Sequence, residues 1–238
     1  MSERERGILY IVSTPIGNLE DLSPRAVACM RDADIVACED TRRTGLLLSG
    51  LGFKKRLVSY HDHNASRRVP SLIRNLKDGL TVALVSDAGT PGVSDPAYRA
   101  VRAAIDEGID VIPIPGPSAL LAALVVSGLP LNSFVFEGFL PPKRVRRKSR
   151  LLKLAAETRT MVFYESPHRV IAMLTDVLEV LGDREVSVSR ELTKRFEETI
   201  RGPVSSSLET MKESKPRGEY TVVVRGLPAK EKSCPENS

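Results

Sequence analysis

Short runs of aliphatic and β-branched residues alternate along the chain with longer segments in which apolar residues recur at helical spacing. In the first half the runs that predict strands are Ile8–Ser13, Ile35–Cys38, Leu57–Tyr60, Thr81–Ser86 and Val111–Ile114. The amphipathic segments between them are Pro24–Arg31, Val69–Lys77 and Ala97–Glu107. Strands that are separated by helices of about ten residues are typical of a largely parallel α/β sheet.

The pattern changes between Pro113 and Pro130, where three prolines in five residues precede an apolar helix. Proline cannot continue a helix or a strand interior, so we place a domain boundary after residue 114. A second α/β set follows, with strands at Phe134–Glu137, Thr160–Tyr164, Glu185–Ser189 and Tyr220–Val224, and helices at about Ser149–Ala156, His168–Leu181 and Val204–Met211. The prediction is an N-terminal α/β domain over residues 1–114, a C-terminal α/β domain over 115–228 and a disordered polar tail over 229–238.

Composition excludes several classes of protein. With 42% hydrophobic and 27% charged residues in 238 positions, the chain resembles folded globular proteins rather than disordered ones. The cysteines Cys29, Cys38 and Cys234 lack CxxC spacing, which favours a reduced protein over a disulfide framework. The longest aliphatic run, Ala119–Val126, is far shorter than the ~20 residues of a membrane helix. We therefore expect a cytoplasmic protein that has no membrane segment.

The net charge of +5 is concentrated in one segment of the second half. Six of the eight residues from Lys143 to Arg150 are basic and none is acidic, so the rest of the chain holds 29 basic against 30 acidic residues. A run of like charges is usually a solvated face, but this density also suits contacts with nucleic-acid phosphates. The candidate phosphate contacts are Lys143, Arg144, Arg146, Arg147, Lys148 and Arg150.

Three loops that are rich in Gly, Pro, Ser and Thr follow predicted strands of the first half, and they begin at Ser13, Asp87 and Pro115. Open α/β sheets bind ligands beyond the carboxyl ends of their strands, and small residues let a ligand approach the backbone closely. Each loop alone could be a tight turn, whereas three at one edge favour a small-molecule site. The sequence lacks the GxGxxG and GxxxxGK[ST] signatures of standard nucleotide sites.

Other polar clusters have both a structural and a functional interpretation. The His-Asp-His sequence at residues 61–63 has no further ligands close by, so we expect solvated loop histidines and no metal site. Glu165, His168 and Arg169 crowd a predicted helix start, either as capping residues or as a polar site. The charged segment Arg190–Glu198 is either a helix start with internal ion pairs or a catalytic loop.

Seven segments, which span the chain from about Ile8 to Val224, together resemble motifs of the tetrapyrrole methylase superfamily. They are Thr14-Pro-Ile-Gly-Asn-Leu, Cys38-Glu-Asp-Thr-Arg, Val85-Ser-Asp-Ala-Gly-Thr-Pro, Pro115-Gly-Pro-Ser-Ala, Phe163-Tyr-Glu-Ser-Pro-His-Arg, Arg190-Glu-Leu-Thr-Lys and Gly218-Glu-Tyr. Within the superfamily the chain is most similar to the enzymes that methylate small-subunit ribosomal RNA. The resemblance implies two α/β domains with S-adenosylmethionine in the cleft between them, and a homodimer. It also implies methyl transfer to the ribose 2′-hydroxyl of a cytidine in the decoding region of 16S rRNA in the small ribosomal subunit.

The resemblance also implies site residues, position by position. The implied cofactor contacts are Pro15, Asp87, Thr90, Ser118, Ala119, Phe163 or Tyr164, Leu192 and the strand near Thr221. A ribose hydroxyl is a very weak acid, so a proton acceptor must assist the attack. We expect Lys194 and Glu165 to be the catalytic candidates, with His168 and Arg169 orienting the RNA.

Two other functions stay open at this point. A methyltransferase of a small tetrapyrrole, from the same superfamily, would also have a polyanionic substrate, although a flexible run of six cations suits an extended polymer better. A non-catalytic RNA-binding module would need no cofactor pocket, and the three small-residue loops argue against it. Binding of S-adenosylmethionine separates this module from both enzymes.

Overall fold

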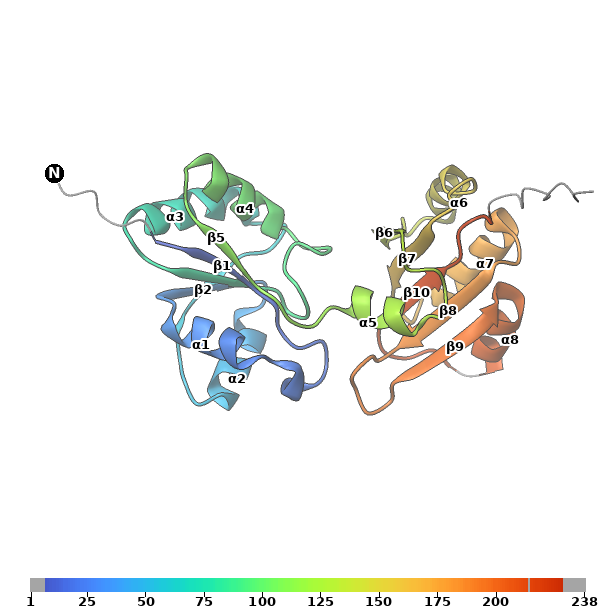
Figure 1. Cartoon of the computed structure of the whole chain (residues 1–238), viewed down its shortest axis with the longest axis horizontal. Coiled ribbons are helices and arrows are strands. Elements are labelled where there is room, and N and C mark those ends of the chain that lie inside the picture. The colour runs from blue at the N-terminus through green and yellow to red at the C-terminus, as the bar shows by residue number, and fades with distance from the viewer. Residues whose placement is uncertain (1–6, 214, 229–238) are drawn as a thin grey trace, which may run out of the picture. The chain divides into compact units, whose positions relative to one another are not determined.

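The protein, described from a computed structural model, contains two compact units (Figure 1). The structure describes residues 7–213 and 215–228, and the predicted tail over 229–238 lies outside them. One unit ends at Ser118 and the other begins at Ala119, four residues beyond the limit predicted for the first domain. Each unit is built on one five-stranded sheet with helices against it, which confirms the α/β class.

The sheet of the first unit is entirely parallel. Its strands are β1 (Leu9–Val12), β2 (Ile35–Cys38), β3 (Arg56–Ser59), β4 (Val82–Val85) and β5 (Val111–Ile114). They lie in the order β3-β2-β4-β1-β5. The residues of β2 and β4 are all buried, as expected of parallel strands that are covered on both faces. All five strands predicted in this half are confirmed.

Helices cover both faces of this sheet (Figure 1). On one face lie α1 (Pro24–Asp32) and α2 (Thr41–Gly50), and on the other α3 (Ala65–Lys77) and α4 (Ala97–Asp106). The chain leaves β1 toward α1 and leaves the neighbouring β4 toward α4, so the two connections diverge to opposite faces. Such a divergence is a topological switch point, and open α/β sheets bind ligands beyond it.

The sheet of the second unit is mixed. Its strands are β6 (Phe134–Phe139), β7 (Thr160–Glu165), β8 (Glu185–Arg190), β9 (Glu198–Pro203) and β10 (Tyr220–Val224), in the order β6-β7-β10-β8-β9. Strands β6 and β7 are parallel, and the other neighbouring pairs are antiparallel. The four strands predicted in this half are confirmed. The edge strand β9 is an addition that the sequence pattern did not predict.

Helices α6 (Arg144–Lys153), α7 (Val170–Leu181) and α8 (Val204–Glu213) enclose the hydrophobic core on one face of this sheet (Figure 1). Helix α5 (Ala119–Val126) contacts β10 and β7. Two expectations are corrected here. Helix α6 begins at Arg144, so the basic segment is helical rather than flexible, and α7 begins at Val170.

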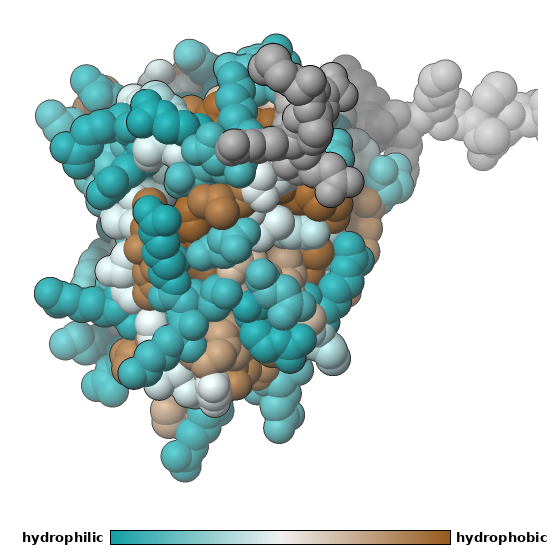
Figure 2. Space-filling view, turned by 90° about the vertical axis from the view of Figure 1, so that its left-hand side faces the viewer, coloured by the Kyte–Doolittle hydropathy of each residue, from teal (hydrophilic) through white to brown (hydrophobic). Residues whose placement is uncertain are grey.

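The surface mixes polar and apolar residues. On the face seen in Figure 2, hydrophilic side chains project beyond hydrophobic residues that reach the surface between them. In the second unit, the large hydrophobic side chains that are mostly exposed include Val145, Leu152 and Phe196. Within the part of the chain that the structure describes, no helix has the length and apolar character needed to cross a lipid bilayer.

Candidate functional site

The loops that follow β1, β4 and β5 are joined to one another at the carboxyl edge of the first sheet. Thr14 and Gly89 form an antiparallel bridge, in which the Thr14 amide donates to the Gly89 carbonyl at 2.9 Å and the Gly89 amide donates to the Thr14 carbonyl at 3.1 Å. The Thr90 hydroxyl donates to the Pro117 carbonyl at 3.0 Å and lies 2.9 Å from Ser13 Oγ. The three loops that were predicted from their composition therefore form one connected surface.

Two glycines make this close packing possible. Gly89 has φ +86°, in the left-handed region that favours glycine. A Cβ atom on Gly116 would lie 2.9 Å from Ser13 Cβ, so any side chain there would push the loops after β1 and β5 apart. Since small residues form much of this surface, a ligand can approach the backbone amides.

Asp87, at the end of β4, connects the loops to the segment after β2. Its Oδ1 accepts a hydrogen bond from the Asp40 amide at 3.0 Å, and its Oδ2 lies 3.3 Å from Arg43 Nη1. Glu39 Oε1 accepts the Asp87 amide at 3.1 Å. Burial, reinforced by the nearby Asp87 carboxylate, raises the pKa of Glu39. Sequence reasoning did not assign Glu39 or Arg43 to the site, although an acidic residue directly after a fully buried strand was a usable signal.

The predicted cofactor contacts of the first half lie at this edge of the sheet. Pro15 follows the Thr14 bridge, Thr90 follows Gly89, and Ser118 follows the Pro117 carbonyl that Thr90 contacts. Ala119 opens α5 and begins the second unit. The structure thus brings Pro15, Asp87, Thr90 and Ser118 together.

The two histidines of the His-Asp-His sequence follow β3 at the same edge. The ring centroids of His61 and His63 are 5.9 Å apart, and His61 Nε2 lies 3.1 Å from Asn64 Nδ2. His63 is exposed and His61 is half-buried. No group of three or more His, Cys, Asp or Glu side chains among residues 7–213 and 215–228 is arranged to hold a metal ion.

In the second sheet, strand alternation separates residues that the sequence could not distinguish. Tyr164 on β7 and Thr221 on β10 are register partners, so both face the same side, where the Tyr164 hydroxyl accepts the Leu120 amide of α5 at 3.1 Å. Phe163 points to the opposite side, where it is fully buried in the core with Val222. The prediction of Phe163 as a cofactor contact is therefore corrected, because its side chain has no exposed surface.

An aromatic cluster surrounds Tyr164. Its ring is edge-on to Phe136, with centroids 5.0 Å apart, and 5.7 Å from the ring of Phe139. Burial raises the pKa of Tyr164. A β-bulge between Phe136 and Gly138 shifts the register, which lets both phenylalanines face Tyr164 although they are three residues apart. Phe139 is 57% exposed and adds an apolar surface that no sequence pattern indicated.

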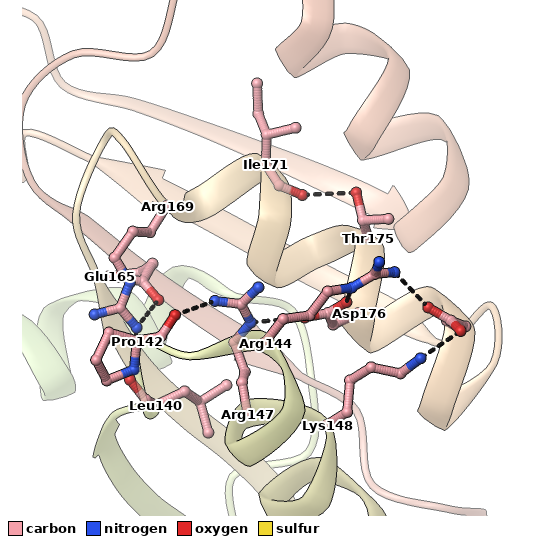
Figure 3. A network of polar contacts seen from close by, with 11 residues as sticks. Leu140, Pro142, Arg144, Arg147, Lys148, Glu165, Arg169, Ile171, Thr175 and Asp176 are labelled. Atoms are coloured by element: carbon pink, nitrogen blue, oxygen red, sulfur yellow. Dashed lines mark hydrogen bonds and ion pairs between the residues drawn. The ribbon is translucent and has the colours of Figure 1, made fainter.

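Glu165 belongs to the helix-covered side of β7, opposite to Tyr164. Its side chain is fully buried, with Oε1 accepting the Ser166 amide at 2.8 Å and Oε2 lying 3.1 Å from Arg169 Nη2 (Figure 3). Burial raises its pKa, although Arg169 opposes the shift. The prediction of Glu165 as a catalytic residue is corrected, because neither carboxylate oxygen reaches the surface where a substrate could bind.

The basic segment forms ion pairs between α6 and α7 (Figure 3). The side chain of Arg147 is 5% exposed, and its Nε donates to Asp176 Oδ2 at 2.7 Å. Arg144 Nε donates to Asp176 Oδ1 at 3.0 Å, and both Arg144 and Lys148 pair with Glu179. The prediction of Arg147 as an RNA contact is corrected, because its guanidinium is enclosed and neutralised by a buried carboxylate.

The remaining predicted RNA contacts differ in their exposure and in whether they have an ion-pair partner. Arg150 makes two hydrogen bonds to Glu137, of 2.7 and 2.8 Å. Arg169 is half-buried by its bonds to Glu165 and to the Leu140 carbonyl. Among the predicted RNA contacts, Lys143, Arg146 and His168 are exposed and have no ion-pair partner in the part of the chain that the structure describes.

The charged segment after β8 is a loop that leads into β9, which excludes the helix start. Glu191 and Thr193 have φ of +48° and +68°, a region that non-glycine residues seldom occupy. Glu191 Oε1 accepts the Glu219 amide and Lys194 Nζ, both at 3.0 Å. A Cβ atom on Gly218 would lie 2.4 Å from Glu191 Cδ, so only glycine leaves room for this carboxylate. Strained backbone that is held by its surroundings is typical of functional sites.

Lys194 lies between two carboxylates. Its Nζ also donates to Glu219 Oε2 at 2.9 Å. Partial burial acts to lower its pKa, but the bonds to Glu219 and Glu191 outweigh burial and the pKa is raised. Lys194 is therefore held as a cation by two carboxylate partners. Leu192, a predicted cofactor contact, is buried in the same loop.

Comparison with known proteins identifies relatives that are similar in sequence. The family model described as Tetrapyrrole (Corrin/Porphyrin) Methylases matches residues 8–207. A protein of Thermotoga maritima named ribosomal RNA small subunit methyltransferase I is 49% identical over 221 residues, which cover 92% of this chain and 99% of that protein. A protein of Escherichia coli O157:H7 with the same name is 45% identical over 240 residues, which cover 100% of this chain and 84% of that protein.

Solved structures show the same fold. A conserved hypothetical protein from Aeropyrum pernix superimposes with a TM-score of 0.72 at 19% identity, covering 94% of this chain and 86% of that one. Uroporphyrin-III C-methyltransferase from Thermus thermophilus, in complex with S-adenosylhomocysteine, superimposes with a TM-score of 0.61 at 20% identity, covering 91% and 97%. The region matched by the family model contains the three joined loops of the first sheet and the strained loop after β8, and the chain belongs to the tetrapyrrole methylase family.

Proposed function

We propose that the protein is an S-adenosylmethionine-dependent methyltransferase that acts on 16S rRNA, at the ribose 2′-hydroxyl of a cytidine in the decoding region. The observation that carries the proposal is the similarity, along nearly the whole chain, to relatives named for methylating small-subunit ribosomal RNA. The cytidine and its hydroxyl follow from the resemblance of the motifs. The protein acts in the cytoplasm, on rRNA within the small ribosomal subunit.

The residues at the edge of the first sheet fit the methyl donor. Gly89 and Gly116 let the three loops pack closely, because a Cβ there would meet Ile16 or Ser13. The carboxylates of Glu39 and Asp87 beside the guanidinium of Arg43 offer both signs of charge, which suits a ligand with a sulfonium and a zwitterionic amino-acid end. When bound, S-adenosylmethionine supplies an electrophilic methyl group. Pro15, Thr90, Ser118 and Ala119 are the further contacts proposed in this segment.

The second unit contributes a surface of a different kind. Tyr164 and Thr221 lie side by side in register, and Phe139 adds an exposed aromatic face next to Tyr164. Aromatic and apolar side chains suit the adenine ring, which has a π-face and little charge. We propose Tyr164, Thr221 and Leu192 as the cofactor contacts of this unit, with Phe139 in addition to those that the sequence indicated.

The contribution of the chain to methyl transfer is chiefly alignment. Transfer to an oxygen is an in-line displacement, which requires the nucleophile at about 3–3.5 Å from the methyl carbon. The hydroxyl proton must leave as the new bond forms, and bulk water takes it up. Lys194, which Glu191 and Glu219 hold in place, is the proposed catalytic residue and donates a hydrogen bond that orients the attacking oxygen.

RNA binding falls to the unpaired cations near the start of α6. Lys143 and Arg146 are exposed and have no acidic partner among the described residues. Three further cations are ion-paired but keep part of their surface in solvent, and they add to the positive electrostatic potential near the start of α6. They are Arg144, Lys148 and Arg150. His168 completes the set of proposed RNA contacts, and a homodimer is the proposed assembly.

Labelled methyl transfer tests this function. The purified protein is mixed with S-[methyl-³H]adenosylmethionine and either small ribosomal subunits that lack the modification or a uroporphyrinogen-type tetrapyrrole. We expect label in the rRNA of the subunits and none in the tetrapyrrole. Label in the tetrapyrrole alone would assign the rival substrate, and binding of RNA without cofactor binding would indicate a non-catalytic module.

A further inference from the structure

The loop between β8 and β9 carries an exposed aromatic side chain that the reaction described above does not use. Phe196 is 65% exposed, and the guanidinium carbon of Arg195 lies 5.6 Å from the centroid of its ring. Both residues occupy the centre of a turn that is closed by the Glu197 amide donating to the Lys194 carbonyl at 3.1 Å. The turn thus presents a flat apolar ring together with a cation.

Hydrogen bonds hold this loop in one conformation. The Lys194 amide donates to the Glu191 carbonyl at 2.9 Å, and the Thr193 amide donates to the Glu197 carboxylate. At the base of the loop, Arg190 pairs with Glu198 at 2.8 Å. An aromatic ring on such a support loses little conformational freedom on binding, which favours recognition.

The loop lies at the end of the sheet that carries the proposed cofactor contacts. Thr221 is the register partner of Ser189, and the next residue of β8, Arg190, is its last before the loop. Tyr164 is the register partner of Thr221 on the other side. A ligand group that reaches Phe196 is therefore bound beyond the same sheet end as the groups that bind near Tyr164.

The charges around Phe196 and the small extent of its apolar surface favour one class of partner. A lone exposed phenylalanine is common on protein surfaces, and a protein partner would require a larger apolar patch. Here the neighbours of Phe196 in the chain are Arg195 and Glu197, so the ring is isolated among charges. Unpaired RNA bases stack on aromatic rings and on arginine guanidinium planes, while nearby cations attract the phosphates.

We propose that Phe196, together with Arg195, forms a stacking platform for an unpaired nucleobase of the ribosomal RNA substrate. The inference rests on the proposed function and extends it, because it names the group that holds a base near the methylated ribose. Stacking fixes the position of a nucleotide without reading its hydrogen-bonding edge. Phe196 is thus a binding residue for RNA that plays no part in binding the cofactor.

The test compares full-length variants on small ribosomal subunits that lack the modification. For Phe196→Ala we expect the KM for subunits to rise roughly 5- to 150-fold, the range set by the loss of one stacked base. The Kd for S-adenosylmethionine and the thermal unfolding midpoint should stay unchanged. Phe196→Trp should retain the wild-type KM. The matched control is Tyr98→Ala, which removes an aromatic side chain that is 70% exposed on α4 and should change nothing.

Three outcomes would overturn the inference. An unchanged KM for Phe196→Ala shows that no base stacks on the ring. A lower unfolding midpoint, or a change of sedimentation from dimer to monomer, assigns Phe196 to protein packing. A wild-type protein that methylates no rRNA overturns the proposed function and this inference with it, whereas an active wild type with an unaffected Phe196→Ala overturns the inference alone.

Discussion

Arg146 and Arg147 are neighbours in sequence, and the fold gives them opposite environments. Arg146 is exposed, whereas Arg147 points into the interface of α6 and α7 and pairs with the buried Asp176. Composition alone treats both as members of one cationic segment. Burial decides that Arg147 serves the stability of the unit and that Arg146 is available to a ligand.

Replacement of Arg147 by Ala should lower the free energy of unfolding by about 3 kcal/mol, because it removes one of the two guanidinium partners of a buried carboxylate. Urea denaturation measures the change. Arg146→Ala is the matched control, and its stability should differ from wild type by at most about 0.5 kcal/mol. Equal losses in both variants would contradict the assignment.

Glu165 should make stability depend on pH. Burial raises its pKa in the folded state above the ordinary value of 4.5, so folding favours the protonated carboxyl. Its stabilising contribution is complete below the unfolded pKa and is lost as the pH rises through the folded pKa. The wild type should therefore lose stability relative to Glu165→Gln as the pH rises above about 4.5, which urea denaturation at several pH values measures.

The single-turnover methylation rate tests separately whether Glu165 takes part in catalysis. Because its carboxylate is fully buried, Glu165→Gln should retain a rate near that of the wild type at a pH where both are folded. A large loss of rate with unchanged stability would restore Glu165 as a catalytic candidate.

At the scale of elements, strands with a plain apolar run could be predicted, whether buried or not. Strand β10 is buried throughout and its apolar run is plain in the sequence, whereas the edge strand β9 contains Arg201, Gly202 and Pro203 and has no fully buried residue. Helix α2 begins with Thr-Arg-Arg-Thr-Gly and has only two buried residues, which leaves a weak helical pattern.

The same limit of prediction from local sequence patterns applies to the candidate site. Small-residue loops after parallel strands predicted that the segments with Thr90 and Ser118 lie at one edge, because every carboxyl end of a parallel sheet lies there. The choice of these two residues came from the family resemblance. The partners of Asp87 required the order of β2 and β4, which no local pattern contains. Likewise, only the structure shows which of Phe163 and Tyr164 points into the core.

The loop after β8 depends on a glycine in the segment before β10. Gly218 has φ +79°, and a Cβ there would overlap Glu191, which holds Lys194. Gly218→Ala should therefore displace Glu191, lower stability by roughly 1–3 kcal/mol and reduce the methylation rate. Gly52→Ala controls for backbone strain alone, because φ is +86° but a Cβ would meet nothing within 4 Å. If both variants lose the same stability and neither loses activity, Glu191 does not organise the loop.

Helix α6 should govern the salt dependence of RNA binding. Changing Lys143 and Arg146 together to Ala removes two exposed cations near the start of α6 that have no ion-pair partner among the described residues. Each phosphate contact contributes about 0.9 to the slope of log K against log salt. We expect the slope to fall by roughly 2 and the affinity for S-adenosylmethionine to stay constant. Filter binding of rRNA at several salt concentrations measures the slope. An unchanged slope would exclude these two residues as phosphate contacts.

Lys54 and Arg56 supply the matched control for that experiment. Both are exposed cations at the start of β3, at the amino edge of the first sheet, and neither has an ion-pair partner among the described residues. The corresponding double Ala variant carries the same change in net charge, yet its salt slope should equal that of the wild type. Equal effects in the two double variants would mean that overall charge, rather than α6, attracts RNA.

For the whole molecule, the residues proposed for one reaction are distributed over both units. The first contributes the joined loops with Asp87 and Thr90, and the second contributes Tyr164, Thr221 and the charged loop with Lys194. Helix α6, with its cations, and the ring of Phe196 also belong to the second unit. The proposed RNA contacts therefore all belong to the second unit, whereas each unit contains proposed cofactor contacts.

The most direct test identifies the methylated nucleoside. Small ribosomal subunits from cells that lack this modification are incubated with the protein and S-adenosylmethionine, and the rRNA is digested and analysed by mass spectrometry. We expect 2′-O-methylcytidine that maps to the decoding region and is absent when the protein is omitted. A methyl group on a base, on another nucleoside outside that region, or on no nucleoside at all would contradict this expectation.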